Sequence, residues 1–316
     1  MQKKASFAIG FDIGGTKCAV SLGKIDNDTI EILKREEVPT GMPLDTLQQL
    51  GKYVQDFMSG YEVKTAGISC GGPLDTENGV ILTPPNLPNW HNFPIVQYIR
   101  DTFGLSATLE NDANACAVAE WRFGAGRGTK NMVFFTFGTG LGAGLILNGA
   151  LYGGSNGNAG EFGHMRLAKK GPVGYGKAGS FEGFCSGGGI ARLAAEMAKR
   201  CKIIPSCIKQ MGGIENITTK KLSQAAFAGD AFAKKVFKKS GEMLGKGLSV
   251  VIDVLNPEKI VLGGVFMRSS ALLVPAMQRQ IEKEALPFSA NICQIVPAQL
   301  SENIGDIAAL AIAKEV

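Results

Sequence analysis

Asp12 and Asp112 are the two carboxylates whose settings most favour chemistry. Asp12 ends an apolar run and precedes the glycine turn Gly14-Gly15-Thr16-Lys17. A charge is costly to bury there unless it serves a cation or accepts hydrogen bonds from its own turn. Asp112 follows Glu110-Asn111 at a strand-to-helix junction, where a carboxylate can cap the helix or take a proton from a hydroxyl group. The residues alone leave both pairs of roles open.

Two further acids and a histidine gather in a glycine-rich stretch. His164 ends the run Asn158-Ala-Gly-Glu-Phe-Gly-His164, which contains Glu161, and Glu182 follows in the same stretch. On local grounds, surface exposure is the ordinary expectation for Glu161 and Glu182. The other histidine, His91, stands alone, which favours a structural role. A Ser-His-Asp hydrolase is not excluded by these counts.

Two glycine clusters share one layout. The first follows Asp12 and the second is Gly138-Thr-Gly-Leu-Gly-Ala-Gly144, and each lies between two apolar strand candidates. A pair of such hairpins favours two backbone cradles whose N–H groups face one anion from opposite sides. The second cluster matches part of the dinucleotide fingerprint, but that motif must open a helix, and Leu145-Ile-Leu-Asn-Gly149 follows here. We therefore do not expect a nicotinamide enzyme, and no G-x-x-x-x-G-K-[ST] phosphate loop occurs.

The composition is that of an ordinary globular chain. Of its 316 residues, 45% are hydrophobic and 19% are charged, which excludes disordered and collagen-like chains. No apolar run reaches the ~18 residues that a membrane helix needs, and we expect neither a signal peptide nor a membrane partner. The seven cysteines never form a C-x-x-C pair, which favours reduced thiols and a cytoplasmic location over a disulfide framework. The 42 glycines, about 13% of the chain, are nearly twice the usual share.

The basic residues do not predict a nucleic-acid partner. The net charge is +5, but Lys and Arg are dispersed along the chain. The densest run, Lys234-Lys235 with Lys238-Lys239, repeats along one expected helix and is typical of a solvated face.

The elements that position these residues are those of an α/β protein. Leu44, Leu47, Leu50, Val54 and Phe57 recur at helical spacing after Pro43. Strands are expected at 7–12, 18–22, 63–70, 106–109, 132–137 and 259–262, and helices at 113–123, 189–201, 231–255, 273–284 and 304–314. Asn111 or Asp112 is expected to cap helix 113–123. The stretch 149–189 is predicted to be irregular and to hold binding loops.

Five short motifs follow one another along the chain. They are Asp12-Ile-Gly-Gly-Thr-Lys17, Glu110-Asn-Asp-Ala-Asn-Ala115, the Gly138–Gly144 cluster, Ala159-Gly-Glu-Phe-Gly-His164 and Leu262-Gly-Gly-Val265. Together they resemble the ROK family, which comprises bacterial sugar kinases and related repressors of the actin-like ATPase superfold, and the resemblance spans nearly the whole chain. It implies two α/β domains of ribonuclease H-like fold, with a duplicated core and an interdomain cleft. We expect a small domain at 1–112 plus the C-terminal helix 302–316, and a large domain at 113–301.

The resemblance also implies roles for individual residues. Asp112 matches the family's catalytic base, which deprotonates the sugar hydroxyl as it attacks the γ-phosphoryl group. Asp12 would hold Mg²⁺ through water. The residues expected to bind ATP are Asp12, Gly14, Gly15, Thr16, Lys17, Gly138, Thr139, Gly140, Gly142, Gly263 and Gly264. Those expected to bind the sugar are Asn86, Asn111, Asp112, Glu161, His164 and Glu182.

One departure from the family pattern concerns zinc. Many members carry a His and C-x-C-G-x-x-G-C-x-E structural zinc site, whose three cysteine slots, aligned on Glu182, hold Val173, Tyr175 and Ser180 here. Cys185 with His164 cannot complete a tetrahedral set. We therefore expect no structural zinc, and packing by Tyr175, Phe181 and Phe184 in its place.

The sequence thus predicts an ATP- and Mg²⁺-dependent hexose kinase that forms the 6-phosphate, with glucose as the first expected substrate. Phosphorylation of N-acetylglucosamine or N-acetylmannosamine is the alternative, fructose ranks lower, and polyphosphate could replace ATP. A non-catalytic sugar-sensing regulator is the alternative from another class, although the first strand begins so close to Met1 that we expect no winged-helix segment before it. By analogy with the family, we expect a homodimer or homotetramer.

Overall fold

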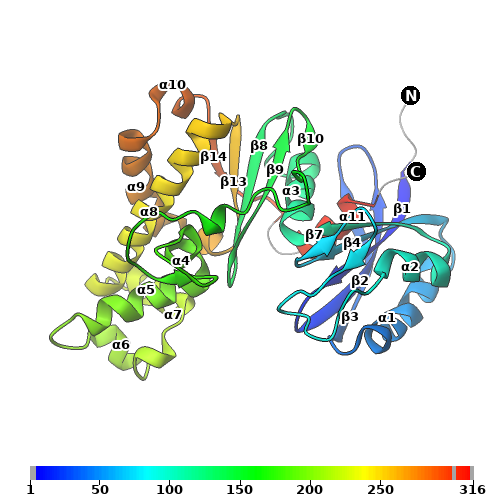
Figure 1. Ribbon diagram of the computed structural model, residues 1–316, viewed down its shortest axis with the longest axis horizontal. Helices are drawn as coiled ribbons and strands as arrows, with labels where there is room; N and C mark the ends of the chain where they lie inside the picture. Colours follow the sequence, from blue (N-terminus) through cyan, green and yellow to red (C-terminus); the bar gives the residue numbers. More distant parts are fainter. Residues whose placement is uncertain (1–4, 301–303, 314–316) are drawn as a thin grey trace. The chain divides into compact units, whose positions relative to one another are not determined.

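A computed structural model describes residues 5–300 and 304–313 of the chain (Figure 1). By its contacts the chain divides into two compact units. The first unit contains Met1–Lys130, Gly144–Ala159 and Gln299–Val316, and the second contains Asn131–Ala143 and Gly160–Ala298. None of the helices in the described residues is long and apolar enough to cross a membrane.

The first unit is built on a five-stranded mixed sheet with the strand order β3-β2-β1-β4-β7. The strands are β1 (Ser6–Ile13), β2 (Lys17–Ile25), β3 (Ile30–Pro39), β4 (Val63–Cys70) and β7 (Ser106–Asn111). β1 pairs antiparallel with β2, as the first glycine hairpin predicts, and parallel with β4, which in turn is parallel to β7. The carboxyl ends of β1, β4 and β7 therefore meet at one edge of the sheet, where Asp12 and Asp112 are found.

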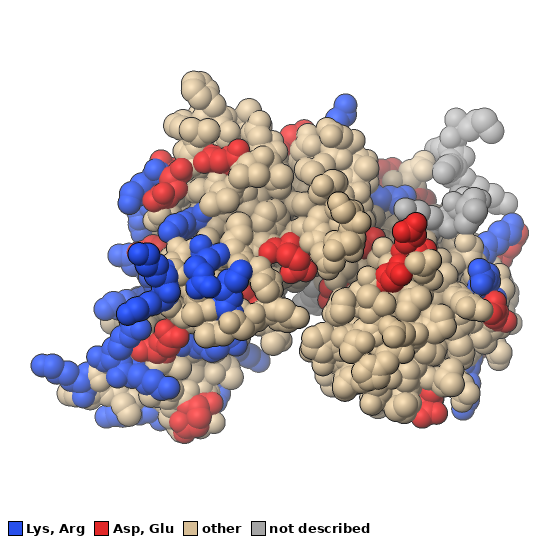
Figure 2. All heavy atoms as spheres, viewed as in Figure 1, with Lys and Arg blue, Asp and Glu red and all other residues tan. Residues whose placement is uncertain are grey.

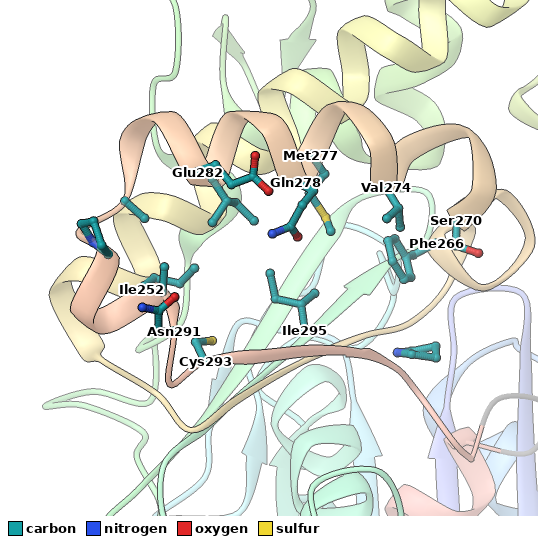
Figure 3. A pocket seen from close by; sticks show the side chains of 15 residues that line it. Ile252, Phe266, Ser270, Val274, Met277, Gln278, Glu282, Asn291, Cys293 and Ile295 are labelled. Atoms are coloured by element: carbon teal, nitrogen blue, oxygen red, sulfur yellow. The ribbon is translucent and has the colours of Figure 1, made fainter.

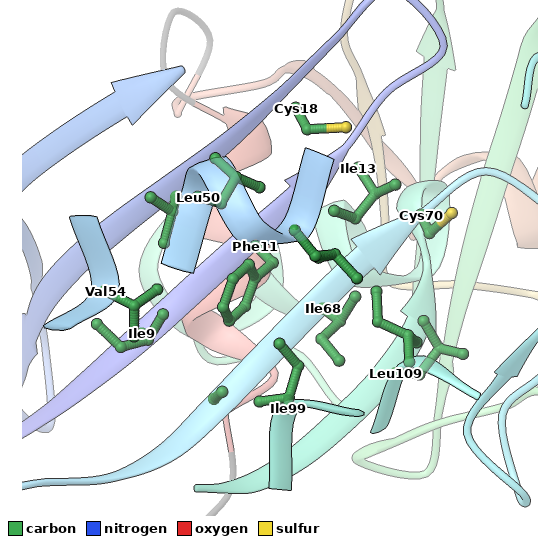
Figure 4. Packing of buried hydrophobic residues seen from close by; sticks show 14 of the residues in the cluster. Ile9, Phe11, Ile13, Cys18, Leu50, Val54, Ile68, Cys70, Ile99 and Leu109 are labelled. Carbon is green, nitrogen blue, oxygen red and sulfur yellow. The ribbon is translucent and has the colours of Figure 1, made fainter. Parts of the chain in front are cut away.

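Helices cover both faces of the first sheet. On one face lie α1 (Pro43–Met58) and α2 (Ile95–Phe103), and alternate residues of β1, such as Ile9 and Phe11, pack with them in a buried cluster (Figure 4). On the other face lies α11 (Ile304–Ala311), against which α3 (Asp112–Phe123) packs. Successive residues of β1 face opposite sides of the sheet. Ile9 and Phe11 face the cluster with α1 and α2, whereas a side chain on Gly10, between them, would meet Ala309 and Leu310 of α11. The short strands β5 (Leu74–Asp75) and β6 (Val80–Ile81) also pair in this unit.

The second sheet repeats the plan of the first, with the strand order β10-β9-β8-β13-β14. Its strands are β8 (Met132–Phe137), β9 (Leu141–Leu147), β10 (Ala150–Leu151), β13 (Lys259–Leu262) and β14 (Gln294–Pro297). β13 is parallel to both β8 and β14, whereas β9 is antiparallel to β10. The duplicated hairpins of the sequence thus correspond to two sheets with the same plan.

The second unit is rich in helices, of which α8 and α9 pack most extensively on each other. Its helices and short strands are η1 (Phe162–His164), β11 (Val173–Gly174), β12 (Lys177–Ala178), α4 (Phe181–Cys185), α5 (Gly187–Lys199), α6 (Ser206–Gln210), η2 (Ile214–Asn216), α7 (Thr219–Phe227), α8 (Ala231–Leu255), α9 (Val265–Glu284) and α10 (Pro287–Ala290). The Asp230 side chain caps α8 by accepting a hydrogen bond from Ala233 N at 2.8 Å.

Several expected elements differ from the observed ones. α9 begins at Val265 rather than at 273, directly after the turn Gly263-Gly264, because its first turns pack on the unit although their sequence is not strongly periodic. The stretch 149–189 is not wholly irregular, since it contains the short elements from β10 to α4 and the start of α5. β3, α2 and β14 were not expected. The expected C-terminal helix 304–314 is observed as Ile304–Ala311, and residues 302, 303 and 314–316 of the expected small domain lie outside the described residues.

The contact division also differs from the expected boundary at residue 112. α3 belongs with the first unit because it packs on α11 and follows β7 without a linker. Residues 144–159 also join the first unit.

Candidate functional site

The glycine turn between β1 and β2 is closed by contacts within its own unit. Gly14 N donates to Lys17 O at 3.2 Å, and the end of β3 binds the same turn because Thr40 Oγ1 donates to Gly14 O at 2.6 Å. Gly15 and Thr16 are exposed. The turn therefore presents backbone to solvent on a fixed frame, as an anion-binding turn requires.

Asp12 lies just before this turn in a strongly acidic setting. Burial, then Asp306 and Asp112, raise the pKa of Asp12 from its ordinary value to about 6, while Arg35 and Lys17 oppose the rise. No hydrogen bond to the Asp12 carboxylate is recorded within the described residues, so it does not bond its own turn. A carboxylate held among carboxylates suits a divalent cation, which would relieve the repulsion. The Asp12 setting thus fits Mg²⁺.

Asn111 and Asp112 occupy the junction of β7 and α3. Asn111 is the N-cap, as predicted, because its Oδ1 accepts hydrogen bonds from Ala113 N at 3.0 Å and Asn114 N at 3.4 Å. Its oxygen is thereby committed to the helix, and its amide nitrogen keeps two donors for a ligand. The predicted choice between Asn111 and Asp112 as cap resolves in favour of Asn111, which leaves Asp112 for chemistry.

The Asp112 carboxylate is accessible and held by one backbone bond. Oδ1 accepts a hydrogen bond from Ala113 N at 2.8 Å, and Oδ2 faces Gly71, on which a Cβ would lie 3.9 Å away. Surrounding protein raises the pKa of Asp112 by desolvation, and the Ala113 N–H lowers it. The side chain is exposed at the surface, so its Oδ2 can be reached by a hydroxyl group of a ligand.

Two other expected residues of the first unit have contacts of their own. The exposed Asn86 lies against the first glycine turn, because a Cβ on Gly15 would meet the Asn86 carbonyl oxygen at 2.6 Å. Lys17 Nζ lies 2.8 Å from Glu37 Oε2, so its ammonium is paired on the sheet surface. The exposed His91 has its Nδ1 3.5 Å from Thr83 Oγ1.

The second glycine turn, between β8 and β9, is held by distant parts of the chain. Gly187 N and Gly188 N, at the start of α5, donate to Gly138 O at 2.8 Å and Thr139 O at 3.3 Å. The turn Gly263-Gly264 lies beside it, because Gly263 N donates to Phe135 O at 2.8 Å. The nucleotide residues expected in this unit therefore do come together.

Gly264 must be glycine for two reasons. Its φ of 66° with a ψ of −126° is a conformation that side chains strongly disfavour. A Cβ there would also collide with the carbonyl oxygen of Phe137, the last residue of β8. The close crossing places the start of α9 at the edge of the second glycine turn.

Glu182 reaches the same turn from α4. Its Oε2 accepts a hydrogen bond from Leu141 N at 3.1 Å, and a Cβ on Gly140 would lie 2.8 Å from that oxygen. Gly163, between Glu161 and His164, is adjacent, since a Cβ on it would lie 3.5 Å from Glu182 Cβ. The segment that carries Glu161 and His164 therefore passes beside Glu182, which also bonds the second glycine turn.

The loop that takes the place of the zinc site is only partly packed. Phe181 and Phe184 are buried, as expected, but Tyr175 is 69% exposed with a φ of 42°, so the expectation that it packs the loop is wrong. The ring of Tyr175 instead lies edge-on to His164, with centroids 5.0 Å apart. Cys185 is buried and its thiol donates to Ser240 O at 3.6 Å. Within the described ranges, no three His, Cys, Asp or Glu side chains are grouped as a metal site.

A hydrolase elbow is excluded by the position of Ser69. The run Gly67-Ile-Ser-Cys-Gly71 has the spacing of a nucleophile elbow. Ser69, however, is 1% exposed within β4, and the strand leads into the turn Gly71-Gly72-Pro73 rather than into a helix. The Ser-His-Asp alternative therefore has no exposed nucleophile at this elbow.

A cavity of about 530 Å³ lies elsewhere in the second unit, beneath one face of α9. Figure 3 shows Phe266, Val274 and Met277 of α9 pointing toward Cys293 and Ile295 near β14. Burial raises the pKa of Cys293 to about 12, which makes its thiol unreactive. None of the expected site residues lines this cavity.

The start of α5 is the part of the site that the sequence analysis missed. Ser186 caps this helix, its Oγ accepting from Gly189 N at 2.9 Å, and the two glycines that follow Ser186 bond the second glycine turn. The run Ser186-Gly-Gly-Gly189 could have indicated this contact. A serine N-cap starts a helix, and the glycines after it let neighbouring backbone approach closely.

The chain is similar to known proteins over nearly its whole length. A model of the ROK family matches residues 8–316. The glucokinase of Thermotoga maritima is 31% identical over 309 residues, which cover 97% of this chain and 97% of that protein. The crystal structure of a ROK family glucokinase from Streptomyces griseus in complex with glucose and AMPPNP has a TM-score of 0.77 at 29% identity, covering 98% of this chain and 99% of that one.

A regulator is similar as well. The crystal structure of a ROK family transcriptional regulator, a homologue of the E. coli MLC protein, has a TM-score of 0.84 at 26% identity and covers 96% of this chain and 76% of that one. The structural matches confirm the expected α/β two-domain actin-like ATPase fold. Because the family model extends over nearly the whole sequence, the chain belongs to the ROK family.

Proposed function

We propose that this protein is a sugar kinase that transfers the γ-phosphoryl group of ATP to the 6-hydroxyl of a hexose, with glucose as the leading substrate. The observation that carries the proposal is the pairing of Asp112 with Asp12 at one edge of the first sheet. One carboxylate is accessible and placed to take a proton, and the other is held where a cation is favoured. Similarity to glucokinases over the full chain supports the same activity.

The residues divide the work as follows. Asp112 accepts the proton of the sugar hydroxyl, while the Asn111 amide, Glu161, His164 and Glu182 bond the other hydroxyls. A site of several acceptors and donors rejects analogues that lack those hydroxyls, since its polar groups would be left unpaired. Phosphoryl transfer depends mainly on positioning and charge neutralisation, so one base and one cation site suffice.

The nucleotide is bound by backbone more than by side chains. The N–H groups of the turns at Gly14–Lys17 and Gly138–Gly142 bond phosphate oxygens, with Gly263 and Gly264 beside the second turn. Asp12 holds Mg²⁺ through water, and the ion supplies charge neutralisation at the transferring phosphoryl group. Lys17 contributes only if it leaves Glu37.

Substrate choice is tested by kcat/KM for glucose, N-acetylglucosamine, N-acetylmannosamine and fructose, each with Mg·ATP and with polyphosphate. We expect glucose with ATP to give the highest value. A higher kcat/KM for an acetylated hexosamine would replace glucose as the proposed substrate, and a higher value with polyphosphate would replace ATP as the proposed donor. Either result would still support kinase activity. No turnover with any pair would contradict it.

A sugar-sensing regulator is the second candidate, because a ROK transcriptional regulator has a TM-score of 0.84 with this chain. Calorimetry that detects sugar binding without turnover would favour it. The accessible Asp112 favours the kinase, since a sensor needs no base.

We further propose that the protein acts in the cytoplasm as a homodimer or homotetramer and without structural zinc. The cysteines are all free, and the slots of the family's zinc cysteines hold Val173, Tyr175 and Ser180. Light scattering of the purified protein tests the oligomeric state, and metal analysis tests the absence of zinc. A monomer, or zinc at one equivalent, would contradict them.

A further inference from the structure

A second cavity of about 530 Å³ opens in the second unit beside Phe184 of α4, the helix whose Glu182 bonds the second glycine turn. Its walls are the segment 168–172, α5 and α8, and none of the residues expected to bind sugar or ATP lines it. Figure 2 shows Lys and Arg side chains gathered over this part of the unit. The cations that line the cavity are Lys170, Arg200, Lys235, Lys238 and Lys239.

The cavity carries an excess of positive charge. Its two carboxylates are already matched, since Glu196 lies 3.9 Å from Arg200 and Glu242 lies 3.3 Å from Lys239. The other three ammonium groups, at positions 170, 235 and 238, take part in no ion pair recorded for the described residues. Like charges around a concave surface focus the potential and attract anions.

The floor of the cavity is apolar. Phe184, Leu193 and Met243 line it and are each at most 6% exposed. The lysines of the run Lys234–Lys239 are exposed, as the sequence predicts, and three of them also line this cavity above its apolar floor. A volume of this size with an apolar floor and a cationic rim matches small-molecule sites, which typically span roughly 300–1,000 Å³.

We propose that this cavity binds a small organic anion, with its apolar body on Phe184 and its anionic group among Lys170, Lys235 and Lys238. Charge complementarity selects the anion, and the buried floor selects the apolar body. Binding stabilises α4, because Phe184 belongs to that short helix. Ser240 of α8 already anchors the helix by donating to Phe184 O at 3.0 Å.

This site has a direct route to the sugar residues. Phe184 and Glu182 belong to the same short helix, and Glu182 bonds Leu141 N at the phosphate turn. A ligand that fixes Phe184 therefore fixes the element that carries Glu182. The regulatory consequence rests on the proposed function, whereas ligand binding itself does not.

The test uses the fluorescent anion 8-anilinonaphthalene-1-sulfonate with the full chain. The variant Lys235→Glu/Lys238→Glu reverses two charges of the cavity wall. The matched control, Lys199→Glu/Lys234→Glu, makes the same charge change at exposed positions of α5 and α8 that do not line the cavity. We expect the affinity for the probe to fall about tenfold or more in the first variant and to stay within about twofold in the control.

Two further measurements locate the probe. Lys170→Glu, on the opposite wall, should weaken binding in the same direction. Amide hydrogen exchange of residues 181–186 should slow when the probe binds to the wild type and not when it is added to the double variant. Equal affinities in the two double variants, or binding without protection of 181–186, would overturn the proposal.

Displacement separates a built site from a charged surface. Phenyl phosphate should displace the probe at a lower concentration than inorganic phosphate, because only the former has a body for the apolar floor. Equal displacement by the two would overturn the proposed site. None of these measurements involves turnover, so failure of the kinase proposal would leave them readable.

Discussion

The two glycine turns have the same place in their sheets and the same proposed role, but they are held by different contacts. The turn after β1 is closed by its own Gly14 and Lys17 and by Thr40 at the end of the neighbouring hairpin strand. The turn after β8 is held by Gly187 and Gly188 of α5 and by Glu182 of α4, all of them more than thirty residues along the chain. The first is therefore a local structure, and the second depends on tertiary packing. Perturbations at the second turn should spread further.

The largest effect is expected at Asp112, the proposed base, which lies in the same unit as the local turn. Asp112→Asn keeps the shape of the side chain and its bond from Ala113 N but removes proton acceptance, so kcat should fall by roughly 10²–10⁴. The affinity for sugar, measured by calorimetry, should change only a few-fold. Asp101→Asn, at an exposed position of α2, is the control. A kcat within threefold of the wild type would rule out Asp112 as the base.

The crossing that supports the second turn should be sensitive to a single methyl group. Gly264→Ala places a Cβ against the Phe137 carbonyl in a disfavoured conformation, which should cost about 3 kcal/mol of unfolding free energy. Gly176→Ala, at a φ of 76° with no atom near its Cβ, should cost about 1 kcal/mol. Urea denaturation measures both. Equal losses would mean that the Phe137 contact is unimportant.

A matched pair of glutamates compares the two turns directly. Glu182→Ala removes the acceptor for the buried Leu141 N–H, and the unfolding free energy should fall by roughly 1.5–3 kcal/mol. Glu37→Ala removes exposed ion pairs with Lys17 and Arg35, and the loss should stay below about 1 kcal/mol. Urea denaturation measures the loss in each variant, and amide hydrogen exchange at residues 138–141 shows whether the second turn opens in Glu182→Ala. Faster exchange at the first turn in Glu37→Ala than at the second turn in Glu182→Ala would contradict the expected difference between the turns.

The smallest effect concerns Asp12 and depends on pH. Because the pKa of Asp12 is raised to about 6 in the fold, the folded protein binds a proton more readily than the unfolded chain, and stability falls as pH rises from about 4 to 6. Asp12→Asn avoids this loss, so it should be about 1–2 kcal/mol more stable than the wild type at pH 7.5 and similar at pH 4. Urea denaturation at both values checks the sign. Saturating Mg²⁺ should narrow the gap at pH 7.5, since the ion favours ionised Asp12 only in the wild type.

The same contrast explains how much could be predicted from the sequence. The hairpin at Asp12 and the strands around it follow from local patterns and are predicted with small errors at the ends, whereas the cap of α3 is predicted only as Asn111 or Asp112. α9 was predicted to begin at 273, because the packing of Val265–Leu272 depends on residues far along the chain. The bond from Leu141 N to Glu182 and the role of Gly187 and Gly188 also require the fold. Tyr175 was expected to pack because it is aromatic, but it lies in a turn with a positive φ and its side chain is exposed.

The most direct test of sugar phosphorylation is product analysis by mass spectrometry after incubation with Mg·ATP and glucose, for the wild type and Asp112→Asn. The wild type should form ADP and a hexose monophosphate in equal amounts, and the variant should form neither at a comparable rate. ADP release without a sugar phosphate, or glucose binding without either product, would contradict the proposed kinase.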